Sequence, residues 1–394
     1  AFLKASKSKK NGISLVNTEC IQLVDTKSCS KLGSGAHPID AIVTEHTSVE
    51  RLLELLNPSG KLQHATGGSW VVLAERYDGS SLRHRRLLKY NRLAAYMKEY
   101  VPRDRRLLNS YKLGQKGRLH YGMLCNAIQW QNPNCKEDET VPPPSMRFSG
   151  EELRKVMPAS WNWGQYHVYL DGALEDVFSE AHKLFKQPKD ACDLFLATHS
   201  RPNLDGYFRQ IAIDASFALS GKSMPHRPKG PKLCVHQSKL SFKEYSRLMS
   251  RSQATLCPWG MGERTACDEH AMLVGAVLLK PNTDFVEGVP DFYEDGRNYL
   301  ALLLDFSDLG NKLARVLENK NGEITKMRQR SFNLLRDTDR SAIARDFWSK
   351  LRQQVGRASN GGFQKPRSND TGRSFAASSI CENPVALKKW SICT

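Results

Sequence analysis

The stretch from Ser252 to Pro281 constrains the fold more than any other part of the chain. An apolar run is cut by Pro258, and a Gly-x-Gly turn follows at Gly260 and Gly262. A helix-compatible segment then reaches Gly275, after which a second apolar run begins. This order predicts a strand, a glycine loop, a helix and a strand, which together form a βαβ unit. The apolar runs are continuous rather than alternating, as in parallel strands buried on both faces.

The glycine loop has a definite chemical capacity. Glycines let the backbone approach a bound group closely, and the following helix presents unpaired N–H groups and the positive end of its dipole. An anion such as a diphosphate suits that position. The glycines alone equally allow a tight strand-to-helix turn that binds nothing.

Alternating elements extend this unit into a larger sheet from about residue 171 onward. Helices are expected at 174–185, 207–219, 241–249, 263–274, 307–317, 323–337 and 340–355. Strands are expected at 193–198, 233–235, 254–257, 276–279 and 298–305. Such alternation indicates an open, doubly wound parallel sheet. Upstream, strands are expected at 40–43 and 70–74 and a helix at 48–56.

Length and charge limit the classes of function. The 394 residues suffice for two domains with substantial cores, and no apolar run approaches the length of a membrane span. The net charge of +17 is compatible with nucleic acid, an anionic membrane surface, the phosphates of a nucleotide sugar or an acidic glycan. The most basic segment, 83–106, has the spacing of an amphipathic helix whose basic face is either solvated or docked on an anionic acceptor or membrane.

The ten cysteines contain no CxxC pair and are too sparse for a disulfide scaffold. Cys257, Cys267 and His270 fit no common zinc spacing, so they are expected to be ordinary core and turn residues, with a metal site as the alternative. Local disulfides in an oxidising compartment are possible for the pairs Cys20/Cys29, Cys125/Cys135 and Cys381/Cys393.

Cations gather on the loops that follow the predicted strands. His199 and Arg201 follow the strand at 193–198, with Arg209 in the next helix; Lys239 follows the strand at 233–235, and Arg264 ends the glycine loop. In open α/β sheets, ligands bind outside the carboxyl ends of the strands. The convergence of these side chains therefore predicts a phosphate site.

A family resemblance supports this prediction. The runs CPWGMGE, VGAVLLKP and VPDFYEDGRNYLALLLDFSDL are similar to the C-terminal half of GT-B glycosyltransferases related to the group 1 and exostosin-like transferases. The likeness covers about residues 185–320. The matching positions, in register without a gap, are Pro258, Gly260, Gly262, Glu263, Asp268, Gly275, Lys280, Pro281, Pro290, Asp291, Asp305, Ser307, Asp308 and Leu309.

The resemblance implies an α/β protein of GT-B fold, with two Rossmann-like domains facing across a cleft. The implied domains are an N-terminal acceptor domain at 36–170 and a C-terminal nucleotide-sugar-binding domain at 171–340, followed by a helix at 341–357 that crosses back. A polar segment at 1–35 precedes them. The tail at 358–394 is rich in Ser, Asn, Gly and Arg without periodicity and is expected to be disordered.

The implied activity is transfer of a sugar from a nucleotide sugar, such as a UDP- or GDP-sugar, to a hydroxyl of a glycan, glycolipid or protein. Arg209 and Arg264 would neutralise the leaving diphosphate, and Asp268 and His270 would contact sugar hydroxyls. His120, from the N-terminal half, is the candidate base. The expected donor-binding residues are His199, Arg201, Arg209, Lys239, Gly260, Gly262, Glu263, Arg264, Asp268, His270 and Lys280.

No aspartate pair ends a predicted strand, so the transfer is expected to need no metal, and the nucleotide sugar is a co-substrate rather than a cofactor. A cytoplasmic or membrane-peripheral location fits, as does the Golgi lumen if an upstream anchor was removed. Two positions depart from the family pattern: Cys267 replaces an Arg and His270 replaces a Glu. These departures keep a weakened, glycan-binding relative as an alternative. The charge keeps a nucleic-acid-binding protein as another, but the basic residues are scattered and no aromatic-plus-basic RNA motif occurs, so no specific nucleic acid is expected.

Overall fold

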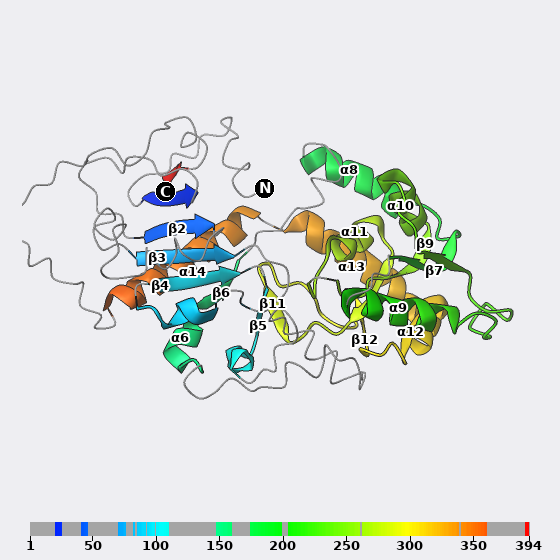
Figure 1. Cartoon of the computed structure of the whole chain (residues 1–394). Helices are drawn as coiled ribbons and strands as arrows, with labels where there is room; N and C mark the ends of the chain where they lie inside the picture. The colour runs from blue at the N-terminus through cyan, green and yellow to red at the C-terminus, as the bar shows by residue number, and fades with distance from the viewer. Residues whose placement is uncertain are drawn as a thin grey trace, which may run out of the picture.

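The computed structural model of the chain describes two α/β domains (Figure 1). The described residues are 20–25, 41–45, 70–75, 82, 85–91, 93–98, 100–109, 147–159, 174–198, 204–260, 262–338, 340–360 and 391–393.

The C-terminal domain is built on a parallel sheet with the strand order β12-β10-β9-β7-β8. Its strands are β7 (Cys192–Ala197), β8 (Leu233–His236), β9 (Ser252–Leu256), β10 (Val277–Pro281) and β12 (Leu300–Leu302). The chain order reverses between β7 and β9, so this is the topological switch point of the sheet. A doubly wound parallel sheet was expected for this half, and that prediction is confirmed.

Helices cover both faces of this sheet. They are α8 (Leu174–Phe185), α9 (Leu204–Phe217), α10 (Phe242–Ser250), α11 (Ala266–Val274), α12 (Leu309–Glu318) and α13 (Glu323–Asp337). α9 and α12 pack on one face, whereas α8, α10 and α11 pack on the other. Successive strand residues such as Leu194 and Phe195 point to opposite faces and enter different cores, which explains the continuous apolar runs.

The N-terminal domain is built on a six-stranded sheet of order β13-β1-β2-β3-β4-β6. Its strands are β1 (Cys20–Asp25), β2 (Ala41–Glu45), β3 (Trp70–Glu75), β4 (Leu93–Lys98), β6 (Val156–Pro158) and β13 (Ser391–Cys393). All pair in parallel except β13, which lies antiparallel to β1. Short helices η1 (Arg85–Lys89), η2 (Arg105–Leu108) and α6 (Gly150–Arg154) complete the described part of this domain.

The last helix, α14 (Arg340–Asn360), leaves the C-terminal domain and packs against the N-terminal sheet (Figure 1). Phe347 and Leu351 are buried in a core with Ala94, Ala95 and Met97 of β4. The expected crossing back is therefore present. The segment expected to be disordered at 358–394 includes the last turn of α14 and the strand β13; its remaining residues lie outside the described part of the chain.

The basic amphipathic helix expected at 83–106 is wrong. The structure places η1, β4, the strand β5 (Tyr100–Pro102) and η2 there. Every residue of β4 is buried, including Lys98, because this strand lies between β3 and β6. Among the described helices, none has the length and apolar character needed to cross a bilayer.

A two-stranded antiparallel ribbon joins the domains. β5 of the N-terminal domain pairs with β11 (Val286–Gly288) of the C-terminal domain. The backbone N–H of Arg103 extends the ribbon by donating to the carbonyl of Phe285 at 2.8 Å. Figure 1 shows the ribbon between the two sheets, with the N-terminal strands pointing toward it.

Candidate functional site

The glycine loop lies at the carboxyl end of β9, beside the switch point of the sheet. Trp259 fixes its first part, because the indole is buried and contacts the rings of Phe208 and Phe285 at centroid distances of 6.0 and 5.6 Å. The backbone N–H of Gly260 donates to the carbonyl of Gly262 at 3.2 Å. The loop is thus a compact turn anchored in the core on one side.

Arg209 reaches this turn from helix α9. A β-carbon at position 260 would lie 2.8 Å from Nη2 of Arg209, so the guanidinium rests against the bare α-carbon of Gly260. The half-buried Arg209 and the glycine turn therefore lie at one place. Helix α11 begins just beyond the turn and presents its N-terminal end to the same region.

Asp268 anchors the start of α11. Its carboxylate accepts hydrogen bonds from the backbone N–H of Thr265 at 2.9 Å and from the Tyr293 hydroxyl at 3.0 Å, and it forms an ion pair with Lys280 at 2.9 Å. Asp268 and Lys280 are both fully buried. Burial lowers the pKa of Lys280, and burial together with Asp268 raises the pKa of Tyr293 well above its usual value.

This network uses two of the expected donor-binding residues. Asp268 and Lys280 face each other inside the domain, and their geometry favours an anchoring role for the helix start rather than contact with a sugar hydroxyl. Glu263 is also fully buried, and it raises the pKa of Lys280 against the effect of burial. Both acidic residues therefore act electrostatically on Lys280.

Arg264 points to the interdomain ribbon. Its guanidinium lies between the rings of Tyr100 and Tyr293, at 5.4 and 4.4 Å from their centroids. Its Nη2 donates to the carbonyl of Val286 at 3.0 Å and to Asp291 at 2.8 Å. Asp291 also pairs with Arg103 of the N-terminal domain. Arg264 therefore links the end of the glycine loop to the other domain.

His270 lies on the second turn of α11 and is 4% exposed. Its ring contacts Phe242 and Tyr245 of helix α10, at centroid distances of 5.3 and 5.6 Å. Burial lowers its pKa from 6.5 to about 4, so the ring is neutral near pH 7. Its buried Nε2 has no hydrogen-bond partner among the described residues.

Of the remaining expected residues, the structure describes only Lys239. Lys239 is exposed on the loop between β8 and α10. His120, His199 and Arg201 lie outside the described residues.

Two disulfides occur in the described part of the C-terminal domain. Cys192 of β7 bonds Cys234 of β8, and Cys257 bonds Cys267 across the glycine loop. The expectation that Cys257 and Cys267 are ordinary core and turn residues is therefore wrong. Their positions at the two ends of one tight loop were the signal in the sequence, since a turn that returns the chain brings its ends together.

The sequence reasoning also gave no role to Tyr293, which contacts both Asp268 and Arg264. Asp291 was matched to the family pattern without a function, and the structure places it between Arg103 and Arg264. Both residues follow β11, far from the glycine loop in the chain, so only the folded structure shows the contact.

A cavity of about 670 Å³ opens beside the ribbon. Its walls are the end of β6, the segment 287–291 and one side of α14. The polar side chains on these walls are those of Glu287, Asp291, Asp346, Lys350, Gln353, Gln354 and Arg357. Carboxylate, amide and cationic groups together suit a ligand rich in hydroxyl groups.

The described architecture is of the GT-B class: two α/β domains built on parallel sheets and joined at the ends of their strands, with a final helix that crosses back. No family model and no curated protein matches the chain.

Solved structures with a similar arrangement include the N-terminal domain of Candida albicans trehalose-6-phosphate phosphatase, with 10% identity, 82% of this chain and 71% of that chain covered, and a TM-score of 0.45. A trehalose-6-phosphate synthase studied with bisubstrate glycomimetics gives 10% identity, coverage of 81% and 74%, and a TM-score of 0.46. HepE from Anabaena, in complex with UDP, gives 14% identity, coverage of 80% and 79%, and a TM-score of 0.40. Likenesses this low transfer neither an activity nor a residue role to this chain.

Proposed function

We propose that the protein is a glycosyltransferase that binds a nucleotide-sugar donor on its C-terminal domain. The observation that carries the proposal is the contact of Arg209 with Gly260 at the switch point of the sheet. A cation, a turn that contains two glycines and the N-terminus of α11 meet there, and each of these features favours the binding of a diphosphate. The resemblance of residues 185–320 to GT-B transferases agrees with this placement.

The donor would lie with its diphosphate on the glycine loop, and Arg209 would stabilise the charge that develops on the leaving diphosphate. Arg264 would act indirectly, by holding the loop end against the ribbon. The buried Nε2 of His270, without a partner among the described residues, would accept a hydrogen bond from a donor hydroxyl. Asp268 and Lys280 would fix the helix start on which this geometry depends.

The acceptor would be a hydroxyl of a glycan, glycolipid or glycoprotein, and the cavity beside the ribbon is the place we assign to it. His120 remains the proposed base for the acceptor hydroxyl. The proposed transfer needs no metal, because Arg209 and the helix start supply the positive charge that a metal would otherwise provide.

A thermal-shift panel of UDP, GDP, ADP and CMP, with and without EDTA, tests the donor site. At least one nucleoside diphosphate should raise the melting temperature, with a dissociation constant in the micromolar range, about −6 to −8 kcal/mol. EDTA should leave the shift unchanged. The absence of any shift would remove the donor site, and sequence-selective DNA or RNA binding that persists at high salt would favour the nucleic-acid alternative instead.

A further inference from the structure

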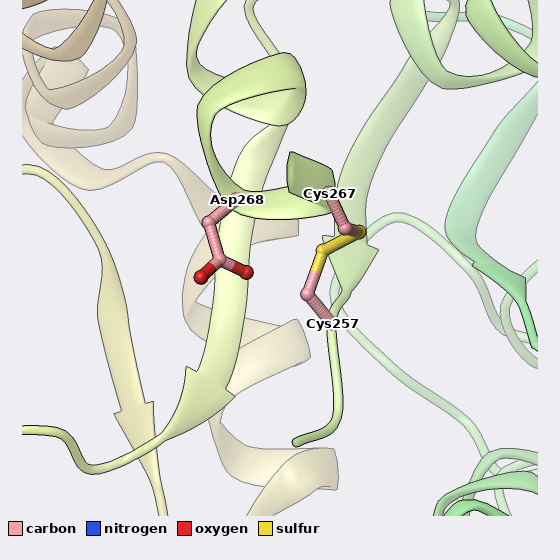
Figure 2. Close-up of side chains that lie close together, drawn as sticks. All are labelled: Cys257, Cys267 and Asp268. Atoms are coloured by element: carbon pink, nitrogen blue, oxygen red, sulfur yellow. A yellow bond between two sulfur atoms is a disulfide. The ribbon is translucent and has the colours of Figure 1, made fainter. Parts of the chain in front are cut away.

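The disulfide between Cys257 and Cys267 encloses the candidate donor loop. Cys257 follows the last residue of β9, and Cys267 is the second residue of α11. Gly260, Gly262 and the N-terminal end of the helix therefore all lie inside, or at the end of, one covalent ring. Figure 2 shows the bonded sulfurs beside the Asp268 side chain at the start of the helix.

The three side chains do not make a metal site. Their sulfur and carboxylate atoms lie within 4.8 Å of one another, a spacing that a metal ion would accept. The sulfurs are bonded to each other, however, and the thiolate is the form of cysteine that binds metals. Asp268 is already paired with Lys280. The chemistry available to this cluster is thiol–disulfide exchange.

Contacts within the fold also restrain the loop. Trp259 is held in the core, Arg264 donates to Val286 and Asp291, and Asp268 holds Thr265 at the helix start. Between Trp259 and Arg264 lie the two glycines, whose backbones have more accessible conformations than any other residue. The covalent bond limits the conformations of this segment in addition to those contacts.

We propose that Cys257 and Cys267 position the candidate donor loop, and that their reduction releases the loop and weakens nucleotide binding. This inference rests on the proposed donor site. In the oxidised protein, the disulfide holds the loop against Arg209 and sets the start of α11. A loop that is already in its binding conformation loses less entropy when a ligand binds.

The exchange is balanced with a small thiol as reductant. Cys267 is half-buried, whereas Cys257 is only 1% exposed, so the thiolate of the small thiol attacks the sulfur of Cys267. The sulfur of Cys257 is the leaving group and takes up a proton. A second thiol then attacks the mixed disulfide and releases Cys267. The protein gains two electrons and two protons, and two thiols become one disulfide.

The experiment compares oxidised and dithiothreitol-reduced full-length protein by calorimetric titration with UDP and GDP. The double variant Cys257→Ser/Cys267→Ser removes the loop disulfide, and Cys192→Ser/Cys234→Ser removes the other disulfide as a matched control. Reduction should weaken the affinity of the wild type and of the control about tenfold, an ordinary coupling between two events. The Cys257→Ser/Cys267→Ser variant should already bind nucleotide weakly, and reduction should not change its affinity.

Hydrogen exchange of the segment 257–267 without nucleotide keeps the two proposals separable. If the oxidised protein binds no nucleotide, the proposed donor site is wrong. Faster exchange of this segment on reduction would still support the proposal that the Cys257–Cys267 disulfide holds the loop. If the oxidised and reduced wild type bind nucleotide with equal affinity, or if this segment exchanges equally fast in both, the disulfide does not hold the loop. The proposed donor site is unaffected by that result. Far-UV circular dichroism of each form shows whether the fold persists.

Discussion

Nη2 of Arg209 lies so close to Gly260 that a β-carbon on the glycine would stand 2.8 Å from it. Arg209 is the sixth residue of α9, which follows β7, whereas Gly260 follows β9. The two strands are neighbours in the sheet but are separated in the chain by β8 and two helices. The contact therefore joins the segments that follow the two strands on either side of the switch point.

The first prediction concerns this contact. Arg209→Ala should lower the affinity for the nucleoside diphosphate by about 1.5–3 kcal/mol, the scale of a hydrogen bond to a charged group. Gly260→Ala should lower it by moving the guanidinium, with little effect on stability, because the end of a flexible side chain can shift. Titration calorimetry with UDP and GDP measures both.

Matched controls are available for both variants. Arg247→Ala removes the same charge from an exposed position on α10, and Gly150→Ala adds a methyl group where no atom lies within 4 Å. Both controls should bind as the wild type does. A loss of affinity in Arg247→Ala equal to that in Arg209→Ala would mean that only net charge matters.

The second prediction concerns the buried pair of Asp268 and Lys280. Lys280→Ala should reduce the free energy of unfolding by about 3–5 kcal/mol, because it leaves a buried carboxylate without its cation. The double variant Asp268→Asn/Lys280→Met should recover part of that loss, since an amide costs less to bury than an unpaired charge. Urea denaturation at pH 7 measures each free energy. A loss in the double variant equal to the sum of the losses in Asp268→Asn alone and Lys280→Met alone would show that the two residues are not coupled.

The third prediction concerns the interdomain contact of Arg264. Arg264→Ala should destabilise the protein by about 3–5 kcal/mol, because it leaves Asp291 with one cation fewer and removes the group between Tyr100 and Tyr293. Gly288→Ala should act in the same direction, since its β-carbon would lie 2.7 Å from Nη1 of Arg264. Denaturant titration measures the loss, and limited proteolysis tests whether the domains separate first.

Arg297→Ala is the control for this test. Arg297 forms an ion pair with Glu294, but both side chains are more than half exposed, at 63% and 60%. Its loss should change the stability by less than about 1 kcal/mol. If Arg297→Ala destabilised the protein as much as Arg264→Ala does, the contact of Arg264 with the ribbon would not explain the loss of stability.

Much of the C-terminal domain could be predicted from the sequence because its signals are local. The limits of the helices at 174–185 and 323–337 agree with those of α8 and α13 to the residue. Ser241 caps α10 by accepting from the N–H of Glu244, and Gly275 ends α11 in the left-handed region with a φ of 75°. Caps and stops of this kind depend on residues within one turn of each other.

The features that could not be predicted depend on contacts between distant parts of the chain. The ribbon of β5 and β11 pairs residues about 185 positions apart, and neither strand exceeds three residues. In the segment 83–106, the buried strand β4 carries its apolar residues in a continuous run, which periodicity does not separate from a helix. The anchoring of Asp268 by Lys280 and Tyr293 likewise becomes visible only when β10 and the segment after β11 are in place.

The last prediction concerns His270, whose pKa is about 4 in the folded protein and 6.5 in the unfolded chain. Between these two values the unfolded chain binds more protons than the folded protein, so acidification favours unfolding. The contribution is absent above about pH 6.5 and grows as the pH falls toward 4. At pH 5 it should cost about 2 kcal/mol of stability relative to pH 7.

His270→Phe separates this effect from ligand binding. Phenylalanine keeps the packing on Phe242 and Tyr245 and removes both the titrating group and the buried Nε2. The variant should therefore lose about 2 kcal/mol less than the wild type between pH 7 and pH 5, as measured by urea denaturation at each pH. His182→Gln, at an exposed position on α8, should keep the wild-type dependence.

Nucleotide affinity of the same variant tests the proposed contact of Nε2 with the donor. If a donor hydroxyl bonds to Nε2, His270→Phe should bind the nucleoside diphosphate more weakly by about 1–3 kcal/mol at pH 7, although its melting temperature is preserved. Unchanged affinity together with a reduced pH dependence would make His270 a packing residue of the α10–α11 interface and remove it from the donor site. An unchanged pH dependence would mean that the ring is not buried in solution as it is in the structure.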